Sequence, residues 1–286
     1  MSRLFAALLA LALVSAAHAA PPRAWHRFDA PTGDPPEAIG GYANGCLLGG
    51  VALPEQGEGF ETIRRHRRRY FGHPALAQWV ADYGRRLHAA GLGPVLVGDL
   101  SQPRGGPMPS GHRSHQLGLD VDIWFTAPDD RTRDHAFASL VDERRERIDP
   151  KVWRPEHVEL LRRAAADPAV ARIFVGWVIK QALCRTETGD RRWLGKIRPW
   201  WSHTRHFHVR LRCPPGSPEC QDQAEPPPGD GCGEELWFSR AEVARRAREA
   251  KLAAAAPPRG KKKPRPAPPP PPTLPARCAA LLRPAP

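Results

Sequence analysis

Two stretches of the chain alternate apolar and polar residues with the period of two that is typical of half-buried strands. They are residues 119–125 and residues 200–211. In the first, Asp120 and Asp122 share the face opposite the aliphatic side chains. In the second, His206 and His208 are about 7 Å apart along one face, while Phe207 points to the core. Each stretch therefore predicts a strand with an apolar face and a face of potential ligands.

Apolar residues spaced by three and four predict amphipathic helices, and uninterrupted apolar runs predict further strands. The predicted helices are residues 74–90, 155–166, 177–185 and 239–256, the last opened by a Ser-x-x-Glu capping box. The further predicted strands are residues 95–100 and 171–175, with a short one within 46–53. Residues 102–111, rich in Gly and Pro, read as a loop that brings His112 and His115 to the first strand. This pattern predicts an α+β fold in which helices flank a small antiparallel sheet.

The remaining segments have weaker patterns. Residues 21–45 read as an arm without periodicity, and the basic cluster 64–69 as a solvated face rather than a substrate contact. We expect His157 on the wet side of its helix. Three tryptophans precede the second strand and are interpreted either as a wall for substrate or as core packing. They are Trp193, Trp200 and Trp201.

The N-terminus has the pattern of a secretory signal in residues 1–19: Arg3, then the apolar run Leu4 to Val14, then a small-residue cleavage site. The apolar run is too short to span a membrane, and no later segment is apolar enough to be a transmembrane span. We therefore expect an exported chain, with a retained N-terminal anchor as the alternative. The predicted division is signal 1–19, catalytic domain 20–256 and a proline-rich basic tail 257–286.

Six cysteines form an even set, which in an oxidising compartment favours three disulfides over metal ligation. Fifteen pairings are possible, and sequence alone does not choose among them. Cys213 and Cys220 flank a proline- and glycine-rich turn, which favours a local bridge between them.

The formal charge of +13 favours an anionic partner. Export argues against nucleic acid and favours a cell-wall polymer rich in carboxylates. Part of this charge belongs to the tail and to arginine-rich helix faces.

The two strands together predict a metal site. A single His-x-His or Asp-x-Asp pair usually holds no metal, but two such pairs on half-buried strands point to one. Histidine and carboxylate ligands without cysteine suit Zn²⁺, with three protein ligands and one open position in a catalytic site.

At these residues the chain resembles a known family. Ser110-Gly-His-x-Ser-His-x-x-Gly-Leu-Asp-Val-Asp122 and His203-x-x-His-x-His208 are similar to the paired motifs of the penicillin-insensitive murein endopeptidases. These belong to the lysostaphin and D-alanyl-D-alanine metallopeptidase group. The resemblance runs over most of the mature chain, all six cysteines included, but not over the proline-rich tail.

The resemblance implies His115, Asp122 and His208 as zinc ligands, and Cys46–Cys278 and Cys184–Cys232 as the other disulfides. It also implies a periplasmic endopeptidase that cleaves D-alanyl–diaminopimelyl cross-links in peptidoglycan. Zinc would lower the pKa of a bound water to about 7 and polarise the scissile carbonyl.

The other histidines of the two motifs then take supporting roles. We assign His206 as general base, with the proton passed to the leaving amine afterwards. His112 and His203 match further histidines of the family motif, and either stabilise the oxyanion or orient His206. Asp120 is expected to fix a histidine tautomer.

Two alternatives stay open. A D,D-carboxypeptidase or dipeptidase could share this metal chemistry, and would leave cross-linked dimers uncut. A non-catalytic wall-binding protein would have a degenerate site, but every expected site residue is present in the sequence.

Overall fold

The structure, a computed structural model, describes residues 22–109, 111–128, 137–255 and 273–283. The expected signal segment and most of the proline-rich tail lie outside these residues. The helices are α1 (Pro22–His26), α2 (Pro74–Ala89), α3 (Pro155–Ala166), α4 (Trp177–Thr186), α5 (Arg240–Ala255) and α6 (Ala276–Ala280), with short 3₁₀ turns η1 (Arg65–Arg67), η3 (Arg192–Lys196) and η4 (Glu234–Phe238). No helix in the described ranges combines the length and apolar character of a bilayer span.

The main sheet has seven strands in the order β12-β11-β13-β8-β7-β5-β4. They are β4 (Gln56–Gly57), β5 (Phe60–Thr62), β7 (Val95–Val97), β8 (Asp120–Trp124), β11 (Val170–Gly176), β12 (Ile197–Trp200) and β13 (His206–Leu211). Its centre is antiparallel, but β11 pairs in parallel with β12 and β5 with β7. The prediction of a small antiparallel sheet is therefore wrong about its size and about its outer pairs, although flanking helices and disulfides are confirmed.

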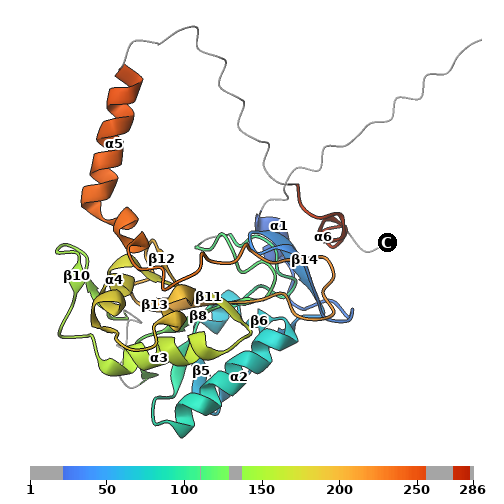
Figure 1. Cartoon of the computed structure of the whole chain (residues 1–286). Helices are drawn as coiled ribbons and strands as arrows, with labels where there is room; N and C mark the ends of the chain where they lie inside the picture. The colour runs from blue at the N-terminus through green and yellow to red at the C-terminus, as the bar shows by residue number, and fades with distance from the viewer. Residues whose placement is uncertain (1–21, 110, 129–136, 256–272, 284–286) are drawn as a thin grey trace, which may run out of the picture.

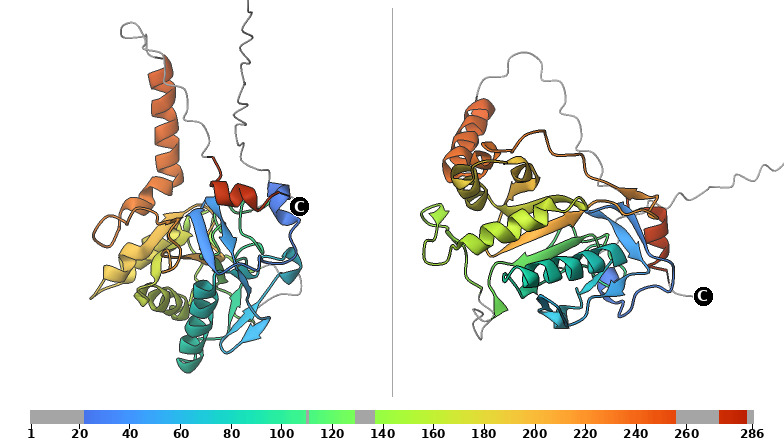
Figure 2. Two further views of the ribbon diagram at one scale, coloured as in Figure 1. Left: turned by 90° about the vertical axis from the view of Figure 1, so that its right-hand side faces the viewer. Right: turned by 60° about the horizontal axis from the view of Figure 1, so that its bottom comes forward.

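The core lies on one face of this sheet, under α2 and α3, which run side by side (Figure 1, Figure 2). Val121, Ile123 and Val209 contribute to it and are fully buried. Burying an aliphatic side chain stabilises the fold by about 1.5–3 kcal/mol, so this face sets the strand register. The polar residues between them are forced onto the opposite face, where the candidate site lies.

The predicted helices 74–90, 155–166 and 177–185 are confirmed within a residue or two. The helix predicted at 239–256 is α5, which has no buried residues and projects from the body (Figure 1). Ser239 Oγ accepts from the Glu242 backbone N–H at 3.2 Å, as an N-cap should. The prediction for His157 is wrong: it is buried, and its ring contacts Phe125 and Trp153.

A second, three-stranded sheet packs against the C-terminal segment that carries Cys278. It consists of β1 (Glu37–Gly41), β2 (Asn44–Leu48) and β14 (Cys220–Gln221), so the arm predicted for residues 21–45 in fact contains a strand. The strand predicted within 46–53 is broken at Gly49, whose φ of +53° favours glycine. Two further pairs are β3 (Val51–Ala52) with β6 (Phe71–Gly72), and β9 (Val141–Asp142) with β10 (Arg147–Ile148).

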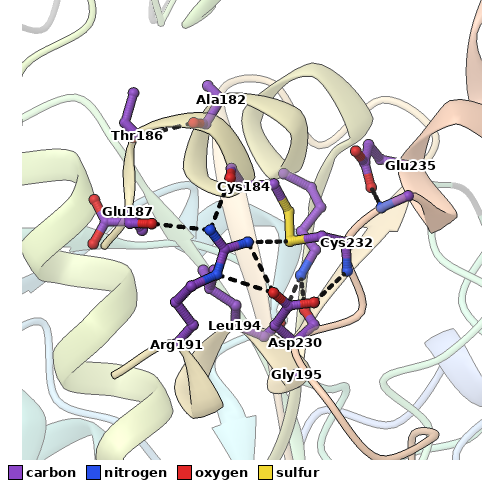
Figure 3. The surroundings of a disulfide bond; sticks show 12 residues. Ala182, Cys184, Thr186, Glu187, Arg191, Leu194, Gly195, Asp230, Cys232 and Glu235 are labelled. Carbon is purple, nitrogen blue, oxygen red and sulfur yellow. Dashed lines mark hydrogen bonds and ion pairs between the residues drawn. A yellow bond between two sulfur atoms is a disulfide. The ribbon is translucent and has the colours of Figure 1, made fainter. Parts of the chain in front are cut away.

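All three disulfides have the expected pairing: Cys46–Cys278, Cys184–Cys232 and Cys213–Cys220. Figure 3 shows the bridge that ties α4 to the segment before η4. The Arg191 guanidinium donates to the Cys184 carbonyl, the Glu187 carbonyl, the Asp230 carboxylate and Cys232 Sγ, at 3.0–3.1 Å. The first residues of α4, Trp177 and Val178, and Phe238 of η4 line the cleft described below.

Candidate metal centre

The candidate centre is built from the polar faces of β8 and β13. These strands pair antiparallel, with His208 opposite Asp122 and Arg210 opposite Asp120. The loop before β8 adds His112 and His115. His115 has a φ of +68°, an uncommon conformation for a residue other than glycine and typical of functional positions.

Four imidazoles surround the buried Asp122 carboxylate. Its Oδ1 lies 3.4 Å from His208 Nδ1, 3.5 Å from His115 Nε2 and 3.7 Å from His206 Nε2. Its Oδ2 lies 3.6 Å from His112 Nε2. Residues from the two predicted strands and from the preceding loop are thus brought to one point.

The outer nitrogens of two of these rings are held in place. His115 Nδ1 donates to the Leu100 carbonyl at 2.6 Å, and His208 Nε2 contacts Asp120 Oδ1 at 2.8 Å. These contacts leave His115 Nε2 and His208 Nδ1 to face Asp122. His115 Nε2 and Asp122 Oδ1 are buried without a hydrogen-bond partner. Orphaned ligand atoms that converge in this way fit a divalent cation such as Zn²⁺.

Distance alone selects a different trio. The ligand atoms of His112, His115 and Asp122 all lie within 4.8 Å of one another. However, His112 Nε2 is already engaged at 3.0 Å by Asp99 Oδ2. His208 presents a nitrogen with no such competitor, so the contacts favour the trio His115, Asp122 and His208.

Charges and burial set the protonation states of the site. Burial lowers the pKa of His208 to about 4, against the opposing effect of Asp120, so this ring is neutral at pH 7. Burial alone would raise the pKa of Asp122, but His206, His115 and His112 together hold it well below its usual range. A neutral imidazole and an ionised carboxylate are the states that metal ligation requires.

His206 and His203 lie on the open side of the cluster. The His206 ring stacks obliquely on Trp124 at 5.1 Å and remains about one-fifth exposed. Burial lowers its pKa, with Asp122 acting in the opposite direction. His203 lies 5.1 Å from the His206 ring and its Nδ1 donates to the Trp201 carbonyl at 2.7 Å.

Sequence reasoning missed the support behind His112. Asp99, two residues after β7, is buried and also accepts from Arg69 Nη1 at 2.9 Å. Arg69 belongs to the cluster interpreted as a solvated face, an interpretation that is wrong for this buried residue. A lone acid after a strand has no spacing pattern that predicts its role. The arginine-rich run 64–69 was the available signal, because a buried arginine needs an acidic partner.

A cleft of about 610 Å³ opens beside His206. Its aromatic lining comprises Trp124, Trp177, Trp200, Trp201 and Phe238. Trp200 and Trp201 are about half exposed, so for these two the substrate-wall interpretation has support, while Trp193 packs against the core.

Comparison with known proteins places the chain among the peptidases. It belongs to the penicillin-insensitive murein endopeptidase family, whose model matches residues 38–283. It is 46% identical over 239 residues to a protein of that name from Klebsiella pneumoniae (strain 342), covering 81% of this chain and 86% of the relative. A relative of the same name from Haemophilus influenzae is 49% identical over 207 residues (70% and 72%), and one from Escherichia coli (strain SMS-3-5) is 43% identical over 266 (90% and 96%).

Proposed function

We propose that this chain is an exported, periplasmic zinc endopeptidase that hydrolyses D-alanyl–diaminopimelyl cross-links in murein. The observation that carries the proposal is the convergence of orphaned His115 and Asp122 ligand atoms with His208, in a chain of this family. The same residues would hold the ion. When bound, Zn²⁺ would supply a Lewis acid for the scissile carbonyl and acidify a water molecule.

The chain's own side chains manage the protons and the geometry. His206 Nε2, on the cleft side of Asp122, accepts the proton of the attacking water and returns it to the leaving amine. Asp99 holds His112 beside Asp122, and the Trp201 carbonyl holds His203 beside His206. They either stabilise the developing oxyanion or orient His206.

The alternatives differ in product. A D,D-carboxypeptidase or dipeptidase would release terminal D-alanine and leave cross-linked dimers intact, and a wall-binding protein would release nothing. A cleft of about 610 Å³ favours an internal bond in a long substrate over a terminal one. Incubation of the purified protein with isolated murein, followed by product identification, distinguishes these functions.

Chelation should abolish hydrolysis, and added Zn²⁺ should restore it. A β-lactam should have no effect, because the proposed nucleophile is water and not a serine. The measurement is dimer cleavage after chelator, after chelator with zinc, and after a fluorescent penicillin. Covalent labelling by the penicillin, or full activity in chelator, would contradict the mechanism.

Asp120→Asn should weaken metal binding by about 10- to 100-fold. The Asp120 carboxylate accepts hydrogen bonds from His208 Nε2, Arg210 Nε and the His115 backbone N–H, and so positions two of the proposed ligands. Metal titration of the purified variant gives the affinity. Asp190→Asn, which changes an exposed acid paired locally with Arg192, is the matched control and should bind metal normally. Unchanged affinity in Asp120→Asn would remove its positioning role.

A further inference from the structure

A second cavity lies on the same face of the sheet as the metal centre, further toward β12. It has a volume of about 430 Å³ and shares Trp200 and Phe238 with the cleft beside His206, so the two form neighbouring chambers. Its floor is Phe174, and Arg172 contributes to its lining. Nothing in the proposed hydrolytic steps uses this chamber.

The register of the sheet connects the chamber to the site. Asp122 pairs with His208, and His208 pairs with Phe174, so the three side chains form one row across β8, β13 and β11. Two strand spacings separate the ends of this row by about 10 Å. Arg172 is two residues before Phe174 and leaves the same face of β11. A peptide lying over Phe174 would therefore reach from the scissile bond to Arg172.

Aromatic contacts make this path continuous. The Phe174 ring lies 5.2 Å from His208 and 5.9 Å from Trp200, both edge-on. Trp200 in turn contacts Phe238 at 6.2 Å. Such a surface packs against aliphatic side chains and leaves recognition of charge to the polar groups at its end.

Arg172 is a buried cation without a described anionic partner. Its side chain is 7% exposed, its Nη2 donates to the Ala224 carbonyl, and its Nε has no hydrogen-bond partner. The neighbouring arginines are each neutralised: Arg198 by Glu234, Arg210 by Asp120 and Arg212 by Glu225. Burial, Arg210 and Arg198 lower the pKa of Arg172, against a smaller opposing effect of Glu225. Such a charge is costly unless an anion joins it.

We propose that this chamber binds a carboxylate of the substrate's peptide, with Arg172 as the residue that recognises it. This proposal rests on the proposed function, because it takes the peptide of murein as the ligand. A carboxylate fits the requirement because it accepts from a guanidinium, and the burial of Arg172 strengthens such a pair. The chamber would then select among peptides by their free carboxylates, a property separate from hydrolysis.

The test compares two uncross-linked stem peptides, one with free carboxylates and one with these carboxylates amidated. Calorimetry with the full-length protein should give about 10- to 100-fold tighter binding of the free acid. Arg172→Gln should bring the two affinities within about twofold. The matched control Arg192→Gln, which removes an exposed arginine paired locally with Asp190, should keep the wild-type preference.

A second variant covers the case in which Arg172→Gln does not fold. Gln223 lines the chamber and accepts from Arg210 Nη1 at 2.7 Å, so Gln223→Glu keeps that contact and adds a fixed carboxylate. It should abolish the preference with Arg172 intact. Equal binding of both peptides by the wild type, or an unchanged preference in Gln223→Glu, would overturn the proposal. Because these peptides carry no cross-link, failure of murein cleavage is a separate result that bears on the proposed function alone.

Discussion

His208→Ala should lose both bound metal and activity, whereas His206→Ala should keep near-stoichiometric zinc and lose hydrolysis by about two to four orders of magnitude. The reason is their different surroundings on one strand. His208 Nε2 is fixed by Asp120 and its Nδ1 faces Asp122 at 3.4 Å, while His206 lies on the cleft side and remains partly exposed. Metal analysis and dimer cleavage by the two purified variants give the comparison.

His88→Ala is the control for this pair, because His88 is an exposed residue near the end of α2 and should affect neither quantity. A zinc-free His206→Ala protein would show that the two roles are assigned wrongly. A His208→Ala protein with full zinc would favour the alternative trio of His112, His115 and Asp122.

Removal of everything after Ala256 should destabilise the protein by about 3–5 kcal/mol, because the Cys46–Cys278 bridge closes a loop of 232 residues. This loss corresponds to a fall in the unfolding temperature of roughly 6–20 °C. The last segment also contributes noncovalent contacts: Leu274 and Cys278 are buried against β2, and Arg277 pairs with Glu37. Thermal unfolding measures the change, and one thiol should become free at Cys46.

Excision of Pro264 to Pro272 is the matched control for this truncation. It retains Cys278 and should leave the unfolding temperature nearly unchanged, provided that the shortened segment still reaches α6. Non-reducing peptide mapping tests the premise in the intact chain. A native protein with a free Cys278 thiol would refute the explanation.

Most elements that position the site could be predicted because their patterns are local. The helix at 155–166 begins with a proline at its first position and repeats its apolar residues regularly, and both signals lie within the segment. The outer strands could not be predicted in this way. β4 and β5 have two and three residues, too few for a period, and their pairing depends on distant segments.

The candidate site likewise contains residues that could be predicted from local spacing and residues that could not. His206, His208, Asp120 and Asp122 could be placed on one surface because spacing by two fixes the face of a strand. Arg172 could not, since the run from Val170 to Gly176 reads as an apolar strand in which one arginine has no visible partner. Asp99 acquires its role only when folding brings Arg69 and His112 to it.

The bridge between Cys46 and Cys278 has a consequence for proteolysis. It closes a covalent ring, and every proposed site residue, from His112 to His208, belongs to that ring. A single backbone cut anywhere between the two cysteines opens the ring but releases no fragment. A protease in the same compartment must therefore cut the ring at least twice before β8 and β13 are no longer covalently linked.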